Sequence, residues 1–362
     1  MKTTKKRILG LDFARSLAII GMIIVNFKTV FGGAGDGLST SFAALFTGRA
    51  AALFVVLAGV GIALMSKRSY SNKDDLTIRR NVKSLIFKRA GFLFVIGLLY
   101  LPVWPADILH FYGVYMVITL LVLWWKPRRV LLLALGVVLF YPIFLVFGNY
   151  DTDWDFSNLD YQGFWTVTGF LRNLFLNGFH PVFPWVAFML AGVWLGRQPL
   201  EDKRFVQKLG VVSVLLFLLI LLTSFGLQSI ANEGLGVTYE DANLLFGCSP
   251  MPPLPIYMLN GIFCAFSVIA ASILILQRWP DSFILNSLVS MGKMALTFYV
   301  AHVVIGMGFS GLITDEAPGG STSLFSVSYA LVFSFICWLF TLQWRQYSAA
   351  GPLEWLMRKL TG

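Results

Sequence analysis

Long apolar runs, separated by short polar spacers, recur from one end of this chain to the other. Many are about 17 to 25 residues long, the length that an α-helix needs to cross about 30 Å of hydrocarbon. The chain has 57% hydrophobic and 13% charged residues, whereas soluble globular proteins have about 25% charged residues. We therefore expect an all-α integral membrane protein, built as one polytopic domain over residues 1–362.

The apolar runs predict a bundle of about ten transmembrane helices. Their approximate ranges are 10–31, 43–66, 88–103, 107–125, 129–148, 180–196, 207–227, 253–277, 289–311 and 322–344. Lys and Arg concentrate in short cytoplasmic loops of membrane proteins. If the N-terminus is cytoplasmic, the 28 Lys and Arg residues all fall in inner segments except Arg15, Lys28, Arg49 and Arg172. Both termini are therefore predicted to be cytoplasmic, and the net charge of +10 indicates a membrane surface rather than nucleic-acid binding.

The first apolar run carries polar residues at both ends. Arg15 and Asn26 are eleven residues apart, so on a helix they share one stripe and lie about 16 Å apart along the axis. Asp12 and Arg15 are three apart and can pair. A charge within a span usually faces the bundle interior or a cavity, which favours a functional stripe. The alternative is structural: an Asp–Arg pair at the inner interface and an interhelical hydrogen bond from Asn26.

Two other polar residues lie within predicted spans. Arg49 is about six residues inside the second one, so it needs an anion, a carboxylate or a set of carbonyls as a partner. His302 lies in the middle of a span. A single His on an apolar helix is more often an interhelical hydrogen-bonding group than a catalyst.

The remaining two histidines begin short predicted spans on the outer side. Asp107 is placed to cap the helix that follows Pro105, and His110 comes one turn later on the same face. Pro181 suits a first helical position, which leaves His180 at the cap. Short spans place these helix ends in a protein-lined recess below the bilayer surface. Because His is the usual general base at neutral pH, both histidines are candidates for catalysis as well as for capping.

Six segments, in this order along the chain, resemble one family of membrane proteins. They are RILGLDFARSLAIIGMIIVN, FTGRAAALFVVLAGVGIAL, DILHFYGVYMV, HPVFPWVAFMLAGVWLGR, MGKMALTFYVAH and GPLEWLMRKLTG. The chain thus resembles the YeiB-like bacterial membrane proteins, which are grouped with the heparan-α-glucosaminide N-acetyltransferases in a transmembrane acyltransferase superfamily. The resemblance implies a helical bundle in the bacterial cytoplasmic membrane, surrounded by its lipids. It also implies transfer of an acyl group, usually acetyl, from cytosolic acyl-CoA to a glycan or small-molecule acceptor on the far side.

The resemblance also implies site residues. The lysosomal relatives have Asn at the position of Asn26 and a catalytic His in the next loop, but here that loop, FKTVFGGAGDGLSTSF, contains no His. We therefore expect His110 or His180 as the base, Asp107 as the residue that orients His110, and Asn26 or Arg49 around the same outward-facing cavity, stabilising the oxyanion. No metal is expected. The phosphates of acyl-CoA would bind basic residues of the inner rim: Arg15, Arg79, Arg80, Lys83, Lys88 and Arg89.

Two alternatives of other classes stay open. A transporter or exporter of a small anionic or glycan-linked solute would use Arg49 as its anion site, and the segment MGKMALT would mark a helix break beside it. A catalytically inactive relative would explain the missing loop His. The aromatic residues of the outer loops 149–179 and 228–252 are typical of membrane interfaces and would also suit a sugar site.

Overall fold

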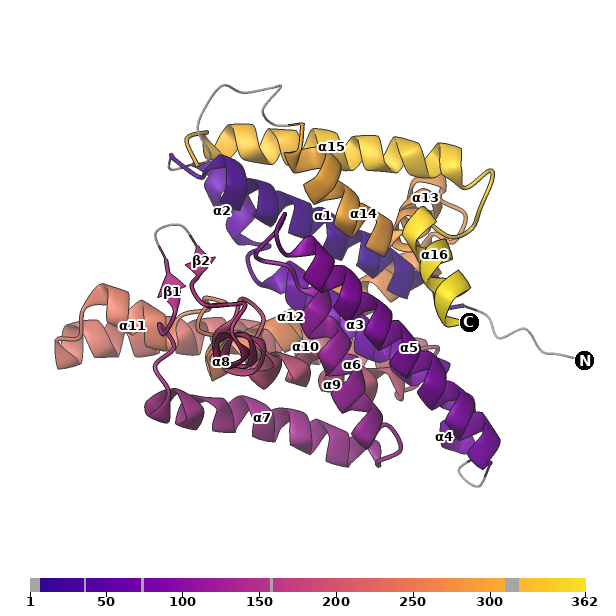
Figure 1. Cartoon of the computed structure of the whole chain (residues 1–362), viewed down its shortest axis with the longest axis horizontal. Helices are drawn as coiled ribbons and strands as arrows, with labels where there is room; N and C mark the ends of the chain where they lie inside the picture. Colours follow the sequence, from indigo (N-terminus) through magenta and orange to yellow (C-terminus); the bar gives the residue numbers. More distant parts are fainter. Residues whose placement is uncertain (1–6, 36, 73–74, 157–158, 310–318) are drawn as a thin grey trace, which may run out of the picture. The chain divides into compact units, whose positions relative to one another are not determined.

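The computed structural model of the chain describes residues 7–35, 37–72, 75–156, 159–309 and 319–362. Helices dominate these residues, and the strands β1 (Trp154–Asp155) and β2 (Asp160–Tyr161) form a short antiparallel pair (Figure 1). The expected all-α class is therefore confirmed. The helices are α1 (Leu9–Phe31), α2 (Leu38–Ala44), α3 (Arg49–Met65), α4 (Lys67–Ser71), α5 (Leu76–Tyr100), α6 (Leu109–Val122), α7 (Pro127–Phe147), α8 (Val167–Arg172), η1 (Asn173–Asn177), α9 (Val182–Gly196), α10 (Lys203–Ser229), η2 (Ile230–Gly234), α11 (Tyr239–Phe246), α12 (Pro255–Arg278), α13 (Phe283–Gly292), α14 (Ala295–Ala301), η3 (His302–Met307), α15 (Ser323–Trp344) and α16 (Pro352–Thr361), where η marks π-helical turns.

Six stretches of the described residues are long and apolar enough to cross a membrane. They are Leu9–Phe31, Leu38–Met65, Pro127–Phe147, Lys203–Gly234, Pro255–Arg278 and Ser323–Trp344. Two further pairs qualify only together, bent by 46° between η1 and α9 and by 72° between α13 and α14. The count is therefore six to eight, and ten spans are not confirmed.

The third and fourth predicted spans, 88–103 and 107–125, account for the difference between eight and ten. The first half of α5 carries basic residues, and α6 has only 14 residues, about 21 Å of helix. The predicted span 289–311 ends at two residues that lie outside the described part of the chain. The cytoplasmic position of both termini stays a prediction.

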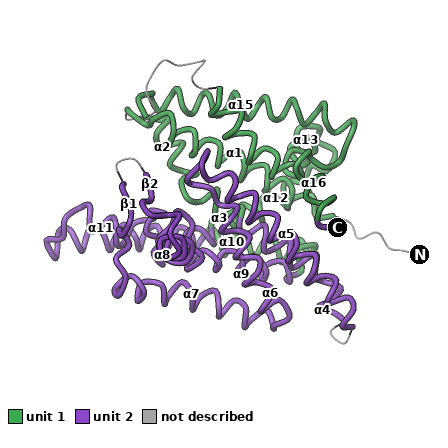
Figure 2. The backbone as a smooth tube through the Cα atoms, in the orientation of Figure 1, with its two compact units in different colours: residues 1–54, 199–214, 264–360 green, residues 55–198, 215–263, 361–362 purple. Residues whose placement is uncertain are grey.

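The described residues group into two compact units, each built from separate stretches of the chain (Figure 2). Unit 1 draws on residues 1–54, 199–214 and 264–360, and its helices α2, α13, α14 and α15 pack against α1. At the end of α13, a Cβ added to Gly292 would lie 1.7 Å from the carbonyl oxygen of Asp12 on α1. Close helix approach through a small residue is a common packing mode in membranes.

Unit 2 draws on residues 55–198, 215–263 and 361–362, and α9 is its most buried helix. α9 packs against α6, α7 and η1. It also approaches α3 very closely, because a Cβ added to Gly59 would lie 2.0 Å from the carbonyl oxygen of Met189. A Cβ on Gly192 would meet the carbonyl oxygen of Val56 at the same distance. The crossing of α3 and α9 therefore depends on glycine on both helices.

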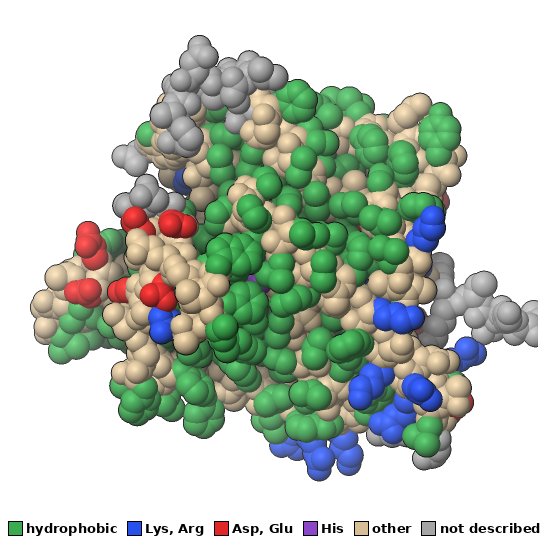
Figure 3. All heavy atoms as spheres, viewed as in Figure 1, with side chains coloured by type: hydrophobic (Ala, Val, Ile, Leu, Met, Phe, Trp, Pro, Cys, Tyr) green, Lys and Arg blue, Asp and Glu red, His purple; other side chains and the backbone are tan. Residues whose placement is uncertain are grey.

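Charges separate along unit 2, as α7 shows. Lys126, Arg128 and Arg129 stand at the start of α7, and a loop with Asp151 and Asp153 follows its end. Its 21 residues extend about 30 Å, the thickness of the hydrocarbon core. Figure 3 shows Lys and Arg side chains over α4 and the start of α7, and Asp and Glu side chains around the strands and α11. This separation agrees with the charge bias from which the orientation was predicted.

Candidate functional site

A cluster of charged side chains lies at the start of α1, in unit 1. The buried carboxylate of Asp12 accepts hydrogen bonds from Nε of Arg7 at 2.5 Å and from Nη1 of Arg15 at 2.6 Å. The hydrogen bond with Asp12 raises the pKa of Arg7 above its ordinary value. The predicted pairing of Asp12 with Arg15 is present, and the structure adds Arg7 as a second partner of Asp12. Two guanidinium groups on one carboxylate leave a positive charge in excess, which suits an anionic ligand.

Further along α1, Asn26 contacts His302, which is 276 positions away in the sequence. Nδ2 of Asn26 lies 2.9 Å from Nε2 of His302, and the His302 side chain is fully buried. As the amide is placed, its N–H donates to Nε2, and that direction corresponds to a neutral imidazole with its proton on Nδ1. The sequence predicts a hydrogen-bonding role for each residue, and the structure adds that the two bond to each other.

Arg49 is the first residue of α3 rather than an interior residue of one continuous helix. α2 ends at Ala44, and a turn over residues 45–48 precedes Arg49. Nη1 of Arg49 reaches back to the carbonyl oxygens of Ala44 at 3.4 Å and Leu45 at 3.2 Å. Backbone carbonyls therefore supply part of the environment of this charge, which is one of the three kinds of partner predicted for it.

In unit 2, Asp107 and His110 form a buried carboxylate–imidazole pair. Oδ2 of Asp107 lies 3.0 Å from Nδ1 of His110 and accepts its backbone N–H at 3.2 Å. Gly97 makes room for the pair, since a Cβ there would lie 2.3 Å from the backbone nitrogen of His110. The helix begins at Leu109, so Asp107 caps it from two residues before its start. Held through Nδ1, the ring presents Nε2 as its second functional nitrogen.

His180 lies in the break between η1 and α9. The N-cap of α9 is Pro181, which has an extended backbone, so the prediction that His180 caps this helix is wrong by one residue. The hydroxyl of Tyr115 donates to the carbonyl oxygen of His180. The ring of His180 packs edge-on against Trp185, with 4.6 Å between the centroids.

Both histidines of unit 2 have a buried ring nitrogen without a partner in the part of the chain that the structure describes, as His302 of unit 1 also has at Nδ1. Nε2 of His110 and Nδ1 of His180 are both buried without a hydrogen-bond partner among the described residues. Phe111, which follows His110, contacts the ring of His180 at 6.1 Å between centroids. Buried polar atoms in native proteins are almost always bonded to protein or to water. The two ring nitrogens are therefore available to a water molecule or to a polar group from outside the chain.

The predicted acyl-CoA-binding residues divide between the units. Arg15 belongs to unit 1, and the other five lie on the first half of α5 in unit 2. Arg79 stacks on the ring of Trp124 at 4.6 Å, and Nη1 of Arg89 lies 3.6 Å from the sulfur of Met65. The remaining three are exposed: Arg80, Lys83 and Lys88. Free side chains on one helix face suit contact with phosphate groups.

Arg197, which follows α9, also lies in unit 2 and was not predicted. Its guanidinium lies 3.6 Å from the centroid of the Tyr70 ring and donates to the carbonyl oxygen of Leu123. Burial lowers the pKa of Arg197 below its ordinary value. Arg197 thereby joins the ends of α4, α6 and α9.

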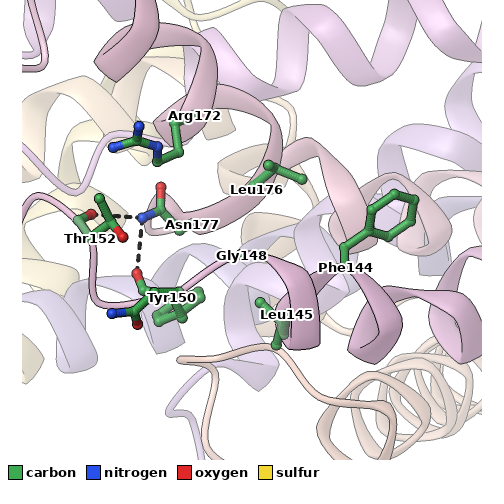
Figure 4. Close-up of a pocket in the computed structure, with 9 residues that line it drawn as sticks. Phe144, Leu145, Gly148, Tyr150, Thr152, Arg172, Leu176 and Asn177 are labelled. Carbon is green, nitrogen blue, oxygen red and sulfur yellow. Dashed lines mark hydrogen bonds between the residues drawn. The ribbon is translucent and has the colours of Figure 1, made fainter.

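A cavity of about 220 Å³ lies at the acidic end of unit 2 (Figure 4). Its lining residues are Phe144, Leu145, Gly148, Asn149, Tyr150, Thr152, Arg172, Leu176 and Asn177. Nδ2 of Asn177 donates to the backbone carbonyl oxygens of Tyr150 and Thr152, both at 2.9 Å, as Figure 4 shows. Asn177 precedes His180 by three residues, so one short segment links the cavity wall to the candidate base.

The four residues expected around one cavity do not fall in one unit. Asn26 and Arg49 belong to unit 1, whereas His110 and His180 belong to unit 2. The single outward-facing cavity therefore stays a prediction. Within the described residues, no group of three or more His, Cys, Asp or Glu side chains is placed to hold a metal ion.

Helices long enough to cross a membrane, with buried imidazoles held by an amide and a carboxylate, define a multi-pass membrane protein with candidate proton-transfer sites. Residues 7–229 match the family described as heparan-alpha-glucosaminide N-acetyltransferase, catalytic, and residues 194–362 match a family described as protein of unknown function (DUF418). The chain belongs to the heparan-alpha-glucosaminide N-acetyltransferase catalytic family, and the two matches confirm its relation to the YeiB-like transmembrane proteins. No curated protein matches the chain.

Proposed function

We propose that this protein transfers an acyl group, in the simplest case acetyl, from cytosolic acyl-CoA to a glycan or other hydroxyl or amine acceptor beyond the bacterial cytoplasmic membrane. Membership of an acetyltransferase family supports the reaction class. The observation that carries the proposal is the buried Asp107–His110 pair, in which Nε2 of His110 is unengaged. A carboxylate that accepts from Nδ1–H leaves Nε2 as a proton acceptor, which is the arrangement of a general base.

In the proposed reaction, His110 or His180 removes the proton of the acceptor hydroxyl or amine. The acceptor oxygen or nitrogen then attacks the thioester carbonyl carbon, and the carbon–sulfur bond breaks after a tetrahedral intermediate. The amide of Asn26 or the guanidinium of Arg49 donates hydrogen bonds to the oxyanion. The acyl group ends on the acceptor, and the proton held by the imidazole passes to the CoA thiolate.

His302 is a further candidate in this scheme. Its hydrogen bond with Asn26 fixes the amide and leaves the second N–H of Nδ2 for an oxyanion. His302 places an imidazole beside Asn26, although it comes from a distant part of the chain. The phosphates of the donor would bind the basic residues of α5, with Arg15 on the path toward Asn26.

Reconstituted protein tests this proposal. Binding of acetyl-CoA is measured by calorimetry, and transfer of labelled acetyl groups to a panel of amino sugars, glycans and amines is followed in proteoliposomes. We expect His110→Asn to retain donor binding and lose most of the transfer, with His180→Asn and His302→Asn tested in parallel. A protein that binds no CoA thioester at millimolar concentration, or that keeps full activity in all three variants, would refute the proposal.

The two bent helix pairs favour a second candidate, a transporter. Breaks of 46° and 72° within candidate spans resemble the discontinuous helices that bind substrates in transporters. A deletion strain separates the two functions. Loss of an acyl group from the cell envelope, detected by mass spectrometry, supports the transferase, while unchanged acylation with altered solute uptake supports the transporter.

A further inference from the structure

Glu354, on the C-terminal helix α16, caps the helical segment that follows the break after α13. The segment Ala295–Met307 leaves α13 at 72°, so its first N–H groups have no carbonyl partner in a preceding helical turn. The carboxylate of Glu354, on α16, takes that place. Its Oε1 accepts from the backbone N–H of Leu296 at 2.7 Å and of Thr297 at 3.2 Å.

The contact between α16 and this segment is tight and reciprocal. Oγ1 of Thr297 donates to Oε2 of Glu354 at 2.6 Å and accepts the backbone N–H of Leu353 at 3.1 Å. Gly351 leaves no room for a side chain, because an added Cβ would lie 2.3 Å from Oε2 of Glu354. The Glu354 side chain is 8% exposed. Glu354 is therefore a helix cap supplied by another helix, and not a member of a solvated charged face.

The other end of the same segment carries His302. Six residues, about 9 Å of helix, separate Leu296 from His302. At that end the segment is held on α1 by the 2.9 Å contact of His302 with Asn26. Gly306 also lies close to α1, since an added Cβ would be 2.5 Å from Cζ of Phe27. The segment is thus fixed at two points, the Glu354 cap and the imidazole.

We propose that Glu354 is a positioning residue for His302. The cap sets the rotation of the segment about its helix axis and its position along that axis. Together these place Nε2 of His302 within hydrogen-bonding distance of Asn26. A slip of one residue turns a side chain by about 100° around the helix axis, which breaks a contact of this kind. The C-terminal helix thereby sets the hydrogen bonding of an imidazole at the far end of the segment that it caps.

Histidine NMR tests the proposal, because the chain has only three histidines. The full-length protein is labelled with 15N in the imidazole rings, placed in lipid nanodiscs, and assigned with single His→Asn variants. We expect Glu354→Ala to move the signal of His302 Nε2 to that of a nitrogen without a donor. The signals of His110 and His180 should stay in place. Lys359→Ala, an exposed position on the same helix, should leave all three histidines unchanged.

Three further variants relate the shift of the His302 Nε2 signal to individual hydrogen bonds. Asn26→Ala gives the reference signal of an unpaired Nε2. Glu354→Gln keeps an acceptor oxygen and should retain most of the wild-type signal. Thr297→Val removes both hydrogen bonds of Oγ1, to Glu354 and from Leu353, and should shift the His302 signal in part. An unchanged His302 signal in Glu354→Ala, or an equal shift of all three histidines, overturns the proposal. If Glu354→Ala does not fold, an unchanged His302 signal in Thr297→Val overturns it equally.

The NMR result does not depend on acyl transfer. If the proposed function holds as well, Glu354→Ala should lower kcat by about 10- to 100-fold through misplacement of His302, and the KM for acyl-CoA should be retained. A wild-type protein that transfers no acyl group refutes the proposed function and leaves the NMR test intact. The two failures are therefore distinguishable.

Discussion

Asn26 and His302 meet at 2.9 Å through Nδ2 and Nε2, although they are 276 positions apart in the sequence. α1 supplies the amide, and the bent pair of α13 and α14–η3 supplies the imidazole. His302 and Phe27, the neighbour of Asn26, are both fully buried. The contact is thus part of the core of unit 1 as well as of its candidate site.

Exchange of this amide for a carboxylate should reverse the proton arrangement of the pair. Asn26→Asp replaces a donor to Nε2 by an acceptor, which favours a protonated His302. We expect the proposed acyl transfer to fall by about 100-fold, because the oxyanion loses its donor. Imidazole 15N NMR reports the protonation state. Asn243→Asp, at an exposed position of α11, serves as the control, and a neutral His302 with full activity in Asn26→Asp would contradict this view of the pair.

Loss of the carboxylate beside His110 should impair catalysis more than binding. Asp107→Asn preserves the shape of the side chain but no longer stabilises an imidazolium ion on His110. We expect kcat to fall by about 100- to 1,000-fold with little change in acyl-CoA affinity, measured by single-turnover kinetics and calorimetry. Asp151→Asn changes an exposed acidic residue of the same unit and should be neutral. Wild-type kcat in Asp107→Asn would remove His110 from the mechanism.

The cluster at the start of α1 should be structural as well as functional. Asp12→Ala leaves Arg7 and Arg15 without their shared carboxylate, which is 1% exposed. The two guanidinium groups left behind are 54% and 26% exposed, so we expect a cost of about 1 kcal/mol. The midpoint of thermal unfolding in detergent should fall accordingly. An equal midpoint in Asp12→Ala and in the control Asp281→Ala, an exposed position in unit 1, would show that the cluster adds no stability.

The crossing of α3 and α9 should tolerate no side chain at Gly192. An added Cβ would lie 2.0 Å from the carbonyl oxygen of Val56, so the helices must separate. Gly192→Ala should therefore cost several kcal/mol and lower the yield of folded protein in size-exclusion chromatography. Gly136→Ala on α7, where a Cβ meets nothing within 4 Å, is the matched control. Equal yields from both variants would mean that the two helices do not meet at this distance.

Stability should depend on pH through Glu354. Burial raises the pKa of its carboxyl above the ordinary value of 4.5, against the opposing effect of the hydrogen bonds from Thr297 and Leu296. The native state therefore holds this proton more tightly than the unfolded chain does. Its contribution to the free energy of unfolding is greatest below about pH 4.5 and declines as the pH rises through the raised pKa. The thermal midpoint of the wild type, relative to that of Glu354→Gln, should therefore fall as the pH rises through the raised pKa of Glu354. A difference between the two midpoints that does not change with pH would contradict this.

Features that depend on a single helix could be predicted from the sequence. The overall composition and the length of the apolar runs suffice to predict an all-α membrane protein, because long apolar helices satisfy their own backbone hydrogen-bonding groups within hydrocarbon. The pair of Asp12 and Arg15 follows from the helical repeat, and the pair of Asp107 and His110 follows from the capping position before a helix. The number of spans could not be predicted in the same way, because the segment MGKMALT indicates a helix break after Gly292 but not the 72° change of direction.

Contacts between distant segments required the tertiary structure. The sequence places the polar residues Asn26 and His302 in separate predicted spans. Only the packing of α1 with the bent helix pair brings their side chains to 2.9 Å. The cap of Glu354 on Leu296 and Thr297 likewise joins helices 57 or 58 positions apart. Local patterns set which face of a helix is polar, because that depends on the helical repeat. Which polar faces meet depends on side-chain packing between helices, and in this protein glycines at the crossings allow that approach.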